Sequence, residues 1–289
     1  MTARSTLSGF VLVGMSLLFG AAGPDVQEQA AASFDEGRAL LAQADFEGAA
    51  AAFATAAKAD PQNQAYRNQY ALIRRVMILR DAMEREQDNA RWDAMARAIR
   101  SFYYDNAVYG EALSLDRQRH VRIGGLESAT LLAETQLELD MNDETVSLLD
   151  RFEREEQTPR SRTLLGIALA RLERLDEAAP IARACALPDG VDPALCFDLA
   201  RLHCLLGEQE AASRALTRCF RTTLPSRLEA AKQRAEAHPD LRALASSAGF
   251  AAVLSTSSQI SESSCSGGAG CGSCPSRSTC GGEAEKGGS

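Results

Sequence analysis

The chain has 289 residues, of which 45% are hydrophobic, 24% are charged and only 6% are aromatic, and its formal net charge is −8. That length accommodates one large domain or two ordinary ones, and abundant alanine and leucine with few aromatic residues favour packed helices over sheets. The acidic balance argues against a nucleic-acid binder, because no strong basic field is present to displace counterions from phosphate.

The N-terminal segment has the three parts of a secretory signal. Arg4 supplies the positive charge, residues 10–22 form a run of 13 apolar or small residues, and small side chains at Gly20 and Ala22 suit cleavage after Ala22. The run is short for a transmembrane helix. We therefore expect residues 1–22 to be a signal peptide and the protein to be exported, to the periplasm or the extracellular space. An uncleaved inner-membrane anchor is the alternative, and the only case in which we expect membrane contact.

A 34-residue period follows in the middle of the chain. Gly166 and Ala200 are 34 residues apart, and so are Ala178 and Ala212. In a frame that begins at Ala30, small residues recur at positions 8, 20 and 27, with larger apolar residues between them and a proline at the end of the first copy. Small residues let two antiparallel helices approach closely, and the proline ends the second helix. The pattern predicts a series of helical hairpins.

The copies extend over residues 30–226 and vary in regularity. The first, with "FDEGRALLAQADFEGAAAAFATAAKADPQN", and the last, with "DPALCFDLARLHCLLGEQEAASRALTRCF", fit the frame best. The stretch 64–92 fits less well and predicts one long amphipathic helix instead.

These copies resemble the tetratricopeptide repeat. The resemblance implies an all-α fold, an αα-hairpin solenoid whose concave groove binds a protein or peptide partner. The segment "HPDLRALASSAGFAAVL" resembles the ending of many bacterial proteins of this class, although His238 replaces the first acid of that ending. Such an array needs its last apolar edge covered, so we expect residues 227–254 to form capping helices.

The same resemblance assigns groove-facing positions on the first helix of each hairpin. They are Arg97, Tyr104, Glu134, Glu138, Arg160, Arg171, Phe197 and Arg201. Their charges are mixed in sign. That fits a partner of mixed charge, and it fits salt bridges between neighbouring repeats equally well.

The sequence offers little chemistry. It contains no nucleotide-binding loop, nucleophile elbow or HExxH motif, and His120, His203 and His238 form no metal-binding pair. We therefore expect a non-enzymatic protein without a cofactor, in which these histidines lie at the surface or in helix seams.

Four cysteines lie within the predicted helices. Cys185 and Cys219 both occupy position 27 of the frame, where a compact hydrophobic side chain suits the packing. Cys196 and Cys204 are eight residues apart on one helix, about 12 Å along its axis, so they cannot bridge each other. In an exported protein, structural disulfides Cys185–Cys196 and Cys204–Cys219 remain an open alternative.

The C-terminal residues 255–289 are rich in serine and glycine and lack aromatic residues, which predicts a flexible tail. The tail carries the other four cysteines, Cys265, Cys271, Cys274 and Cys280. Export favours disulfides among them. A zinc or iron–sulfur site and a thiol–disulfide relay at "CGSC" are alternatives in which the tail would be the active element. Free or intermolecularly paired thiols are a further alternative.

Overall fold

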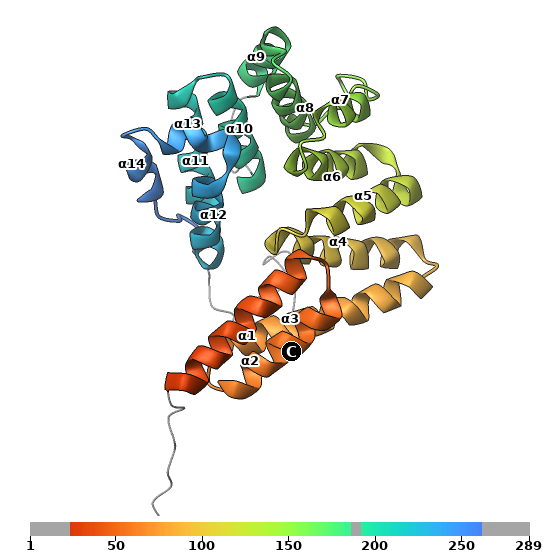
Figure 1. Ribbon diagram of the computed structural model, residues 1–289. Coiled ribbons are helices and arrows are strands. Elements are labelled where there is room, and N and C mark those ends of the chain that lie inside the picture. Colours follow the sequence, from red (N-terminus) through yellow and green to blue (C-terminus); the bar gives the residue numbers. More distant parts are fainter. Residues whose placement is uncertain (1–23, 186–191, 262–289) are drawn as a thin grey trace, which may run out of the picture. The chain divides into compact units, whose positions relative to one another are not determined.

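The computed structural model describes residues 24–185 and 192–261. Within these ranges every regular element is a helix, and successive helices pack as antiparallel neighbours (Figure 1), which confirms the predicted all-α fold of helical hairpins. The chain forms two compact units, with the boundary between Ser128 and Ala129. None of the described helices is long and apolar enough to cross a membrane. The predicted signal segment 1–22 and the tail from residue 262 onward lie outside the described residues.

Unit 1 contains two hairpins and one additional helix. Its helices are α1 (Pro24–Ala42), α2 (Phe46–Ala59), α3 (Gln64–Arg85), α4 (Asn89–Asp105) and α5 (Tyr109–Ile123). α1 pairs with α2 and α4 pairs with α5, while α3 packs between α2 and α4. The core between them is built from Phe53, Ile73, Trp92, Ile99 and Leu115, among others.

Helix α6 begins in unit 1 and continues into unit 2. Unit 2 comprises α6 (Gly125–Glu138), α7 (Asn142–Leu149), α8 (Pro159–Arg171), α9 (Leu175–Ala184), α10 (Pro193–Leu205), α11 (Gln209–Thr222), α12 (Pro225–Ala237), the 3₁₀ helix η1 (Pro239–Leu241), α13 (Arg242–Ala245) and α14 (Phe250–Leu254). α8 packs against α9 and also against α10, one period later, and α10 packs against α11. First helices of successive hairpins therefore lie side by side.

The small residues of the frame lie where helices touch. A Cβ added to Gly37 would be 2.6 Å from the Phe53 ring, and one added to Gly166 would be 2.9 Å from Leu202 Cδ2. The alanines at the corresponding positions are fully buried: Ala49, Ala56, Ala112, Ala133, Ala178, Ala200 and Ala212. Close helix approach is thus the physical reason for the period.

The turns between paired helices share one backbone feature. Ala44, Ala107, Asp140, Glu173 and Gly207 all have positive φ, from 55° to 77°. The last four are 33, 33 and 34 residues apart. This left-handed residue reverses the chain after the first helix of each hairpin, and only one of the five is a glycine.

Side-chain caps determine where several helices begin. The side chains of Asp45, Asn63, Asp88, Thr158 and Asp192 each accept a hydrogen bond from a backbone N–H of the following turn. The cap at Asp88 begins α4 at Asn89, so α3 ends at Arg85, short of the predicted end at residue 92.

The C-terminal helices cover the last hairpin. Leu241, Leu244, Phe250 and Val253 are buried in one cluster with side chains of α10 and α11. The described part of the chain extends past the predicted boundary at residue 254. Residues 255–261 return to the C-terminal end of α11, where Ser258 Oγ donates a hydrogen bond to the Thr223 carbonyl. The Gln259 N–H donates a hydrogen bond to the Arg221 carbonyl at 2.8 Å.

Candidate functional site

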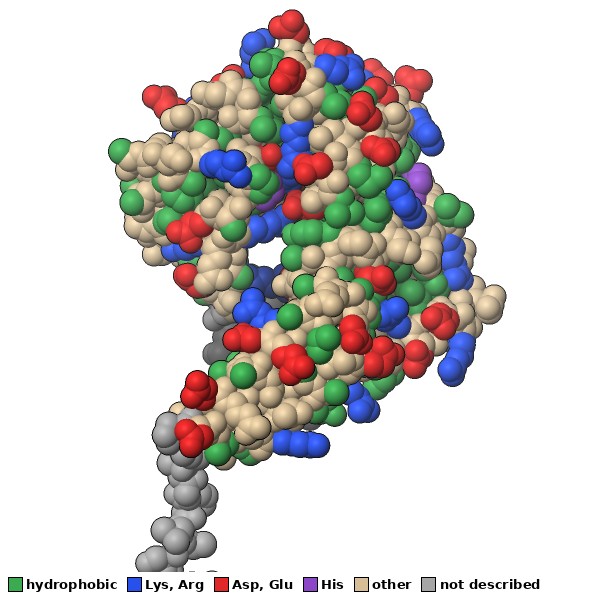
Figure 2. All heavy atoms as spheres, viewed as in Figure 1, with side chains coloured by type: hydrophobic (Ala, Val, Ile, Leu, Met, Phe, Trp, Pro, Cys, Tyr) green, Lys and Arg blue, Asp and Glu red, His purple; other side chains and the backbone are tan. Residues whose placement is uncertain are grey.

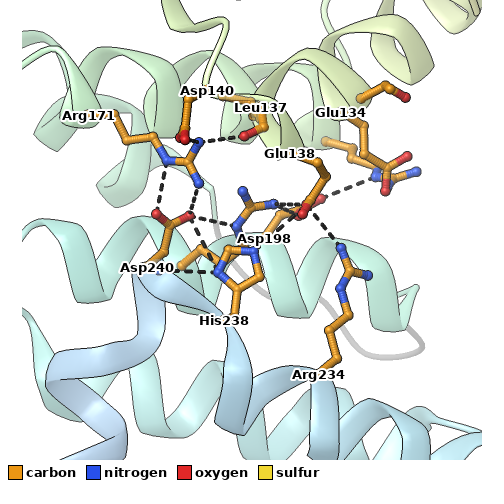
Figure 3. Close-up of polar contacts among 12 residues, drawn as sticks. Glu134, Leu137, Glu138, Asp140, Arg171, Asp198, Arg234, His238 and Asp240 are labelled. Atoms are coloured by element: carbon orange, nitrogen blue, oxygen red, sulfur yellow. Dashed lines mark hydrogen bonds and ion pairs between the residues drawn. The ribbon is translucent and has the colours of Figure 1, made fainter. Parts of the chain in front are cut away.

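Six of the eight predicted groove residues lie in unit 2. They are Glu134 and Glu138 on α6, Arg160 and Arg171 on α8, and Phe197 and Arg201 on α10. Figure 3 shows three of them, Glu134, Glu138 and Arg171, facing a C-terminal segment of the chain. This segment, residues 234–240, contains the end of α12 and the start of η1. Figure 2 shows basic and acidic side chains gathered between α8 and α10 on this face of the unit.

Asp240 of η1 is bound by two arginines. Arg171 donates from Nε and Nη2 to its two carboxylate oxygens, each at 2.9 Å, and Arg201 donates from Nε to Oδ2 at 2.9 Å. Arg171 also donates to the Leu137 carbonyl and to Asp140. Burial acts to raise the pKa of Asp240, but the charges and hydrogen bonds of the two arginines outweigh it and lower the pKa below its usual value.

Glu138 of α6 holds the other end of the segment. Its Oε1 accepts hydrogen bonds from Arg201 Nη1 at 3.3 Å and Arg234 Nη2 at 3.1 Å, and His238 Nε2 lies 3.8 Å away. Burial acts to raise the pKa of Glu138, but the three neighbouring bases hold it at about 2. Contacts from residues as far as 96 positions along the chain thus converge on one carboxylate.

Arg160 extends the cluster toward the start of α8. Its Nη2 donates to Glu134 at 2.6 Å and its Nε to Asp198 at 3.3 Å, while Asp198 also accepts from Arg201 at 3.3 Å. Burial acts to lower the pKa of Arg160, but these carboxylates raise it, so the guanidinium stays charged. The cluster alternates in sign throughout, which is the condition under which buried charges are tolerated.

Phe197 and His238 form the apolar part of the site. Phe197 is buried, with the Arg234 guanidinium 4.7 Å above its ring and the His238 ring edge-on at 5.6 Å. His238 is itself buried, and its Nδ1 accepts a hydrogen bond from the Asp240 N–H at 3.2 Å. The residue thus lies in a seam, where it caps η1.

In the structure the charged side chains at these positions form salt bridges within the chain, which is the second of the two alternatives that the sequence left open. Arg201 is 0% exposed, so it cannot touch a partner unless the segment moves. Arg160 and Arg234 keep 22% and 40% of their side-chain surface exposed. Arg201 Nη2 and His238 Nε2 are buried without a hydrogen-bond partner among the described residues.

The other two predicted groove residues lie in unit 1. Arg97 is half exposed and pairs with Asp93 and Glu127. The Tyr104 ring lies 4.1 Å beneath the Arg100 guanidinium and packs edge-on against Tyr109. Both side chains are thus held by neighbours within their own unit.

The four helical cysteines are free and buried, so the pairs Cys185–Cys196 and Cys204–Cys219 are not formed in the structure. Cys185 Sγ lies 3.7 Å from Thr163 Oγ1, and Cys219 Sγ lies 4.0 Å from Thr223 Oγ1. Burial raises the pKa of Cys196 to about 11 and that of Cys219 to about 12. These thiols serve as compact packing groups.

Within residues 24–185 and 192–261, no group of histidine, cysteine or acidic side chains could hold a metal ion. Cys265, Cys271, Cys274 and Cys280 lie outside the described residues, so the predicted disulfide, metal and relay alternatives stay predictions. No model of a known protein family matches the chain, and neither does any curated protein.

Sequence reasoning missed four members of the cluster: Asp198, Arg234, His238 and Asp240. Asp198 could have been found from its place three residues before Arg201 on one helix. The other three lie in the capping segment, whose contacts with α6 and α8 span 96 and 69 residues of sequence, respectively. No local signal marks those contacts.

Proposed function

We propose that the chain is a non-enzymatic protein–protein interaction scaffold of the tetratricopeptide class that acts outside the cytoplasm. The observation that carries the proposal is the packing of α8 against α10, with side-chain hydrogen bonds from α8 to α6, which places side chains of α6, α8 and α10 along one face of unit 2. Stacked hairpins of this kind form extended surfaces that suit a peptide or protein partner. Export is proposed from the N-terminal sequence alone.

The partner in this proposal touches the parts of the cluster that remain exposed. Arg234 lies over Phe197 at the edge of the face and keeps two-fifths of its side-chain surface accessible. Arginine over an aromatic ring is a frequent element of protein interfaces, because it offers both hydrogen bonds and flat apolar surface.

Affinity capture tests the proposal. The full chain, purified without its predicted signal segment, is used as bait on the extracytoplasmic fraction of its source cells. The matched bait carries Arg234→Ala, and the control bait carries Arg227→Ala, an exposed residue of the same helix. We expect a discrete partner whose recovery falls with Arg234→Ala and is unchanged with Arg227→Ala. Recovery of no protein above an unrelated helical bait would contradict the proposal.

A further inference from the structure

Helix α3 is the one helix of unit 1 outside the hairpin pattern. It is 22 residues long, yet only Ile73 and Val76 are buried along it. It packs between α2 and α4. Four further side chains of α3 are partly buried against the same core, and 13 of its 22 residues are exposed.

The open side of α3 carries a continuous stripe of basic and small residues. We call this the α3 stripe, and it consists of Arg67, Ala71, Arg74, Arg75, Ile78, Ala82 and Arg85. Apart from the adjacent pair Arg74 and Arg75, its members follow one another at steps of three or four residues, which places them on one side of a helix. All seven are exposed, and Ile78 at the centre is 61% exposed.

The charge of α3 is opposite to that of the rest of the chain. The helix has five arginines and two acids, a balance of +3, whereas the whole chain carries −8 and the remainder therefore −11. Arg74, Arg75 and Arg85 make no ion pair with any described residue. By contrast, Arg80, which points toward the core side, lies 4.4 Å over Phe46 and 3.9 Å from Glu111.

We propose that the α3 stripe is a docking surface for an acidic amphipathic helix of a partner protein. This inference rests on the proposed scaffold function and names a second surface for it. The stripe spans 19 residues of helix, about 27 Å from the first to the last, which matches a partner helix of similar length. Ala71 and Ala82 permit close approach, Ile78 supplies an apolar anchor, and the flanking arginines select carboxylates.

A protein partner fits this surface better than a membrane does. The stripe contains one large apolar side chain, Ile78. The other large aliphatic side chain exposed on α3 is Leu72, which is 41% exposed. Insertion of a helix into a lipid interface requires a broad apolar face, which α3 lacks.

The test uses a defined probe with the full chain. The probe is a fluorescein-labelled 18-residue peptide in which glutamates flank a leucine stripe at helical spacing. The same peptide with lysine in place of glutamate serves as the charge control. Fluorescence anisotropy should show saturable binding of the acidic peptide that weakens as salt is added, and no binding of the lysine peptide.

A matched pair of variants localises the binding. Arg74→Glu with Arg75→Glu should weaken binding about tenfold, because attraction becomes repulsion at two sites. Arg227→Glu with Arg242→Glu, at exposed arginines of unit 2, changes the net charge by the same amount and should leave affinity unchanged. Ile78→Ser should weaken binding about fivefold while the slope of affinity against salt stays the same. Circular dichroism verifies that each variant remains helical.

Several outcomes would overturn the inference. The first is equal weakening of peptide binding by both double variants. The second is tight binding of the chain to anionic vesicles, abolished by Arg74→Glu with Arg75→Glu, while the peptide does not bind. The third is self-association of the chain in sedimentation that the same variant removes. If the unaltered bait captures a partner through Arg234 but the acidic peptide does not bind, the α3 inference fails and the scaffold function stands. If the unaltered bait captures nothing, the scaffold function itself fails.

Discussion

The left-handed turn residues show how a repeat is encoded one position at a time. Ala44, Ala107, Asp140, Glu173 and Gly207 adopt the same positive φ although four of them carry a Cβ. Such a residue costs roughly 1 kcal/mol in that conformation, and the packing of the two flanking helices must exceed this cost. The small residues at helix contacts could be predicted from the sequence, because they recur with the period. Most of the left-handed turn residues could not, because four of the five are not glycine.

Gly207→Ala should lower the free energy of unfolding by about 1 kcal/mol. A Cβ at Gly207 meets no atom within 4 Å, so the loss reports the positive φ and not a clash. Gly110→Ala is the matched control, because its Cβ also meets no atom, but it lies in a helix without positive φ. We expect that variant to be unchanged or slightly stabilised. Urea unfolding followed by circular dichroism measures both, and equal effects would show that φ is not the cause.

At the scale of elements, the ion cluster attaches the capping segment to three successive first helices. Arg171 and Arg201 bind Asp240, and Glu138 binds Arg201 and Arg234. The sequence predicted which helical positions share a face, because that follows from the period. It could not predict that the face is filled by residues 234–240, since those contacts depend on how far the chain returns after α11.

Removal of the Glu138 charge should destabilise the protein in a pH-dependent way. Its pKa in the folded protein is about 2, below the ordinary 4.5, so the carboxylate contributes stability at neutral pH that is lost as the pH falls from about 5 to about 2. Glu138→Gln should cost on the order of 2 kcal/mol at pH 7 and almost nothing near pH 2.

Urea midpoints at pH 7, 4 and 2.5 measure this difference. Glu236→Gln, at an exposed position of α12 with no ion pair to a described residue, is the control and should follow the parent at every pH. A Glu138→Gln deficit that stays constant with pH would mean that side-chain packing, and not the charge, is responsible.

At the scale of the whole molecule, the chain separates charge and cysteine along its length. The basic stripe belongs to α3, the balanced ion cluster belongs to unit 2, and four of the eight cysteines are buried in α10, α11 and the end of α9. Composition predicted an acidic, helical protein with few chemical motifs. Composition does not show where the charges lie, because a net charge of −8 for the whole chain is compatible with a single helix of charge +3.

The buried thiols give a prediction for the intact chain. Native protein treated with a maleimide at pH 7.5 should leave Cys185, Cys196, Cys204 and Cys219 unlabelled over the time in which a free thiol reacts completely. Thiolate is the reactive form, and burial raises the pKa of Cys219 to about 12 and that of Cys196 to about 11. Labelling in denaturant without reductant should then modify all four, because the structure holds them as free thiols.

Peptide mapping by mass spectrometry assigns each label. The matched control is Gly207→Ala, which should speed labelling of Cys204 and Cys219 in proportion to its loss of stability if reaction requires opening of the last hairpin. Labels absent in denaturant but present after reduction would instead show that these cysteines are paired in the exported protein, and the packing role assigned to them would be wrong.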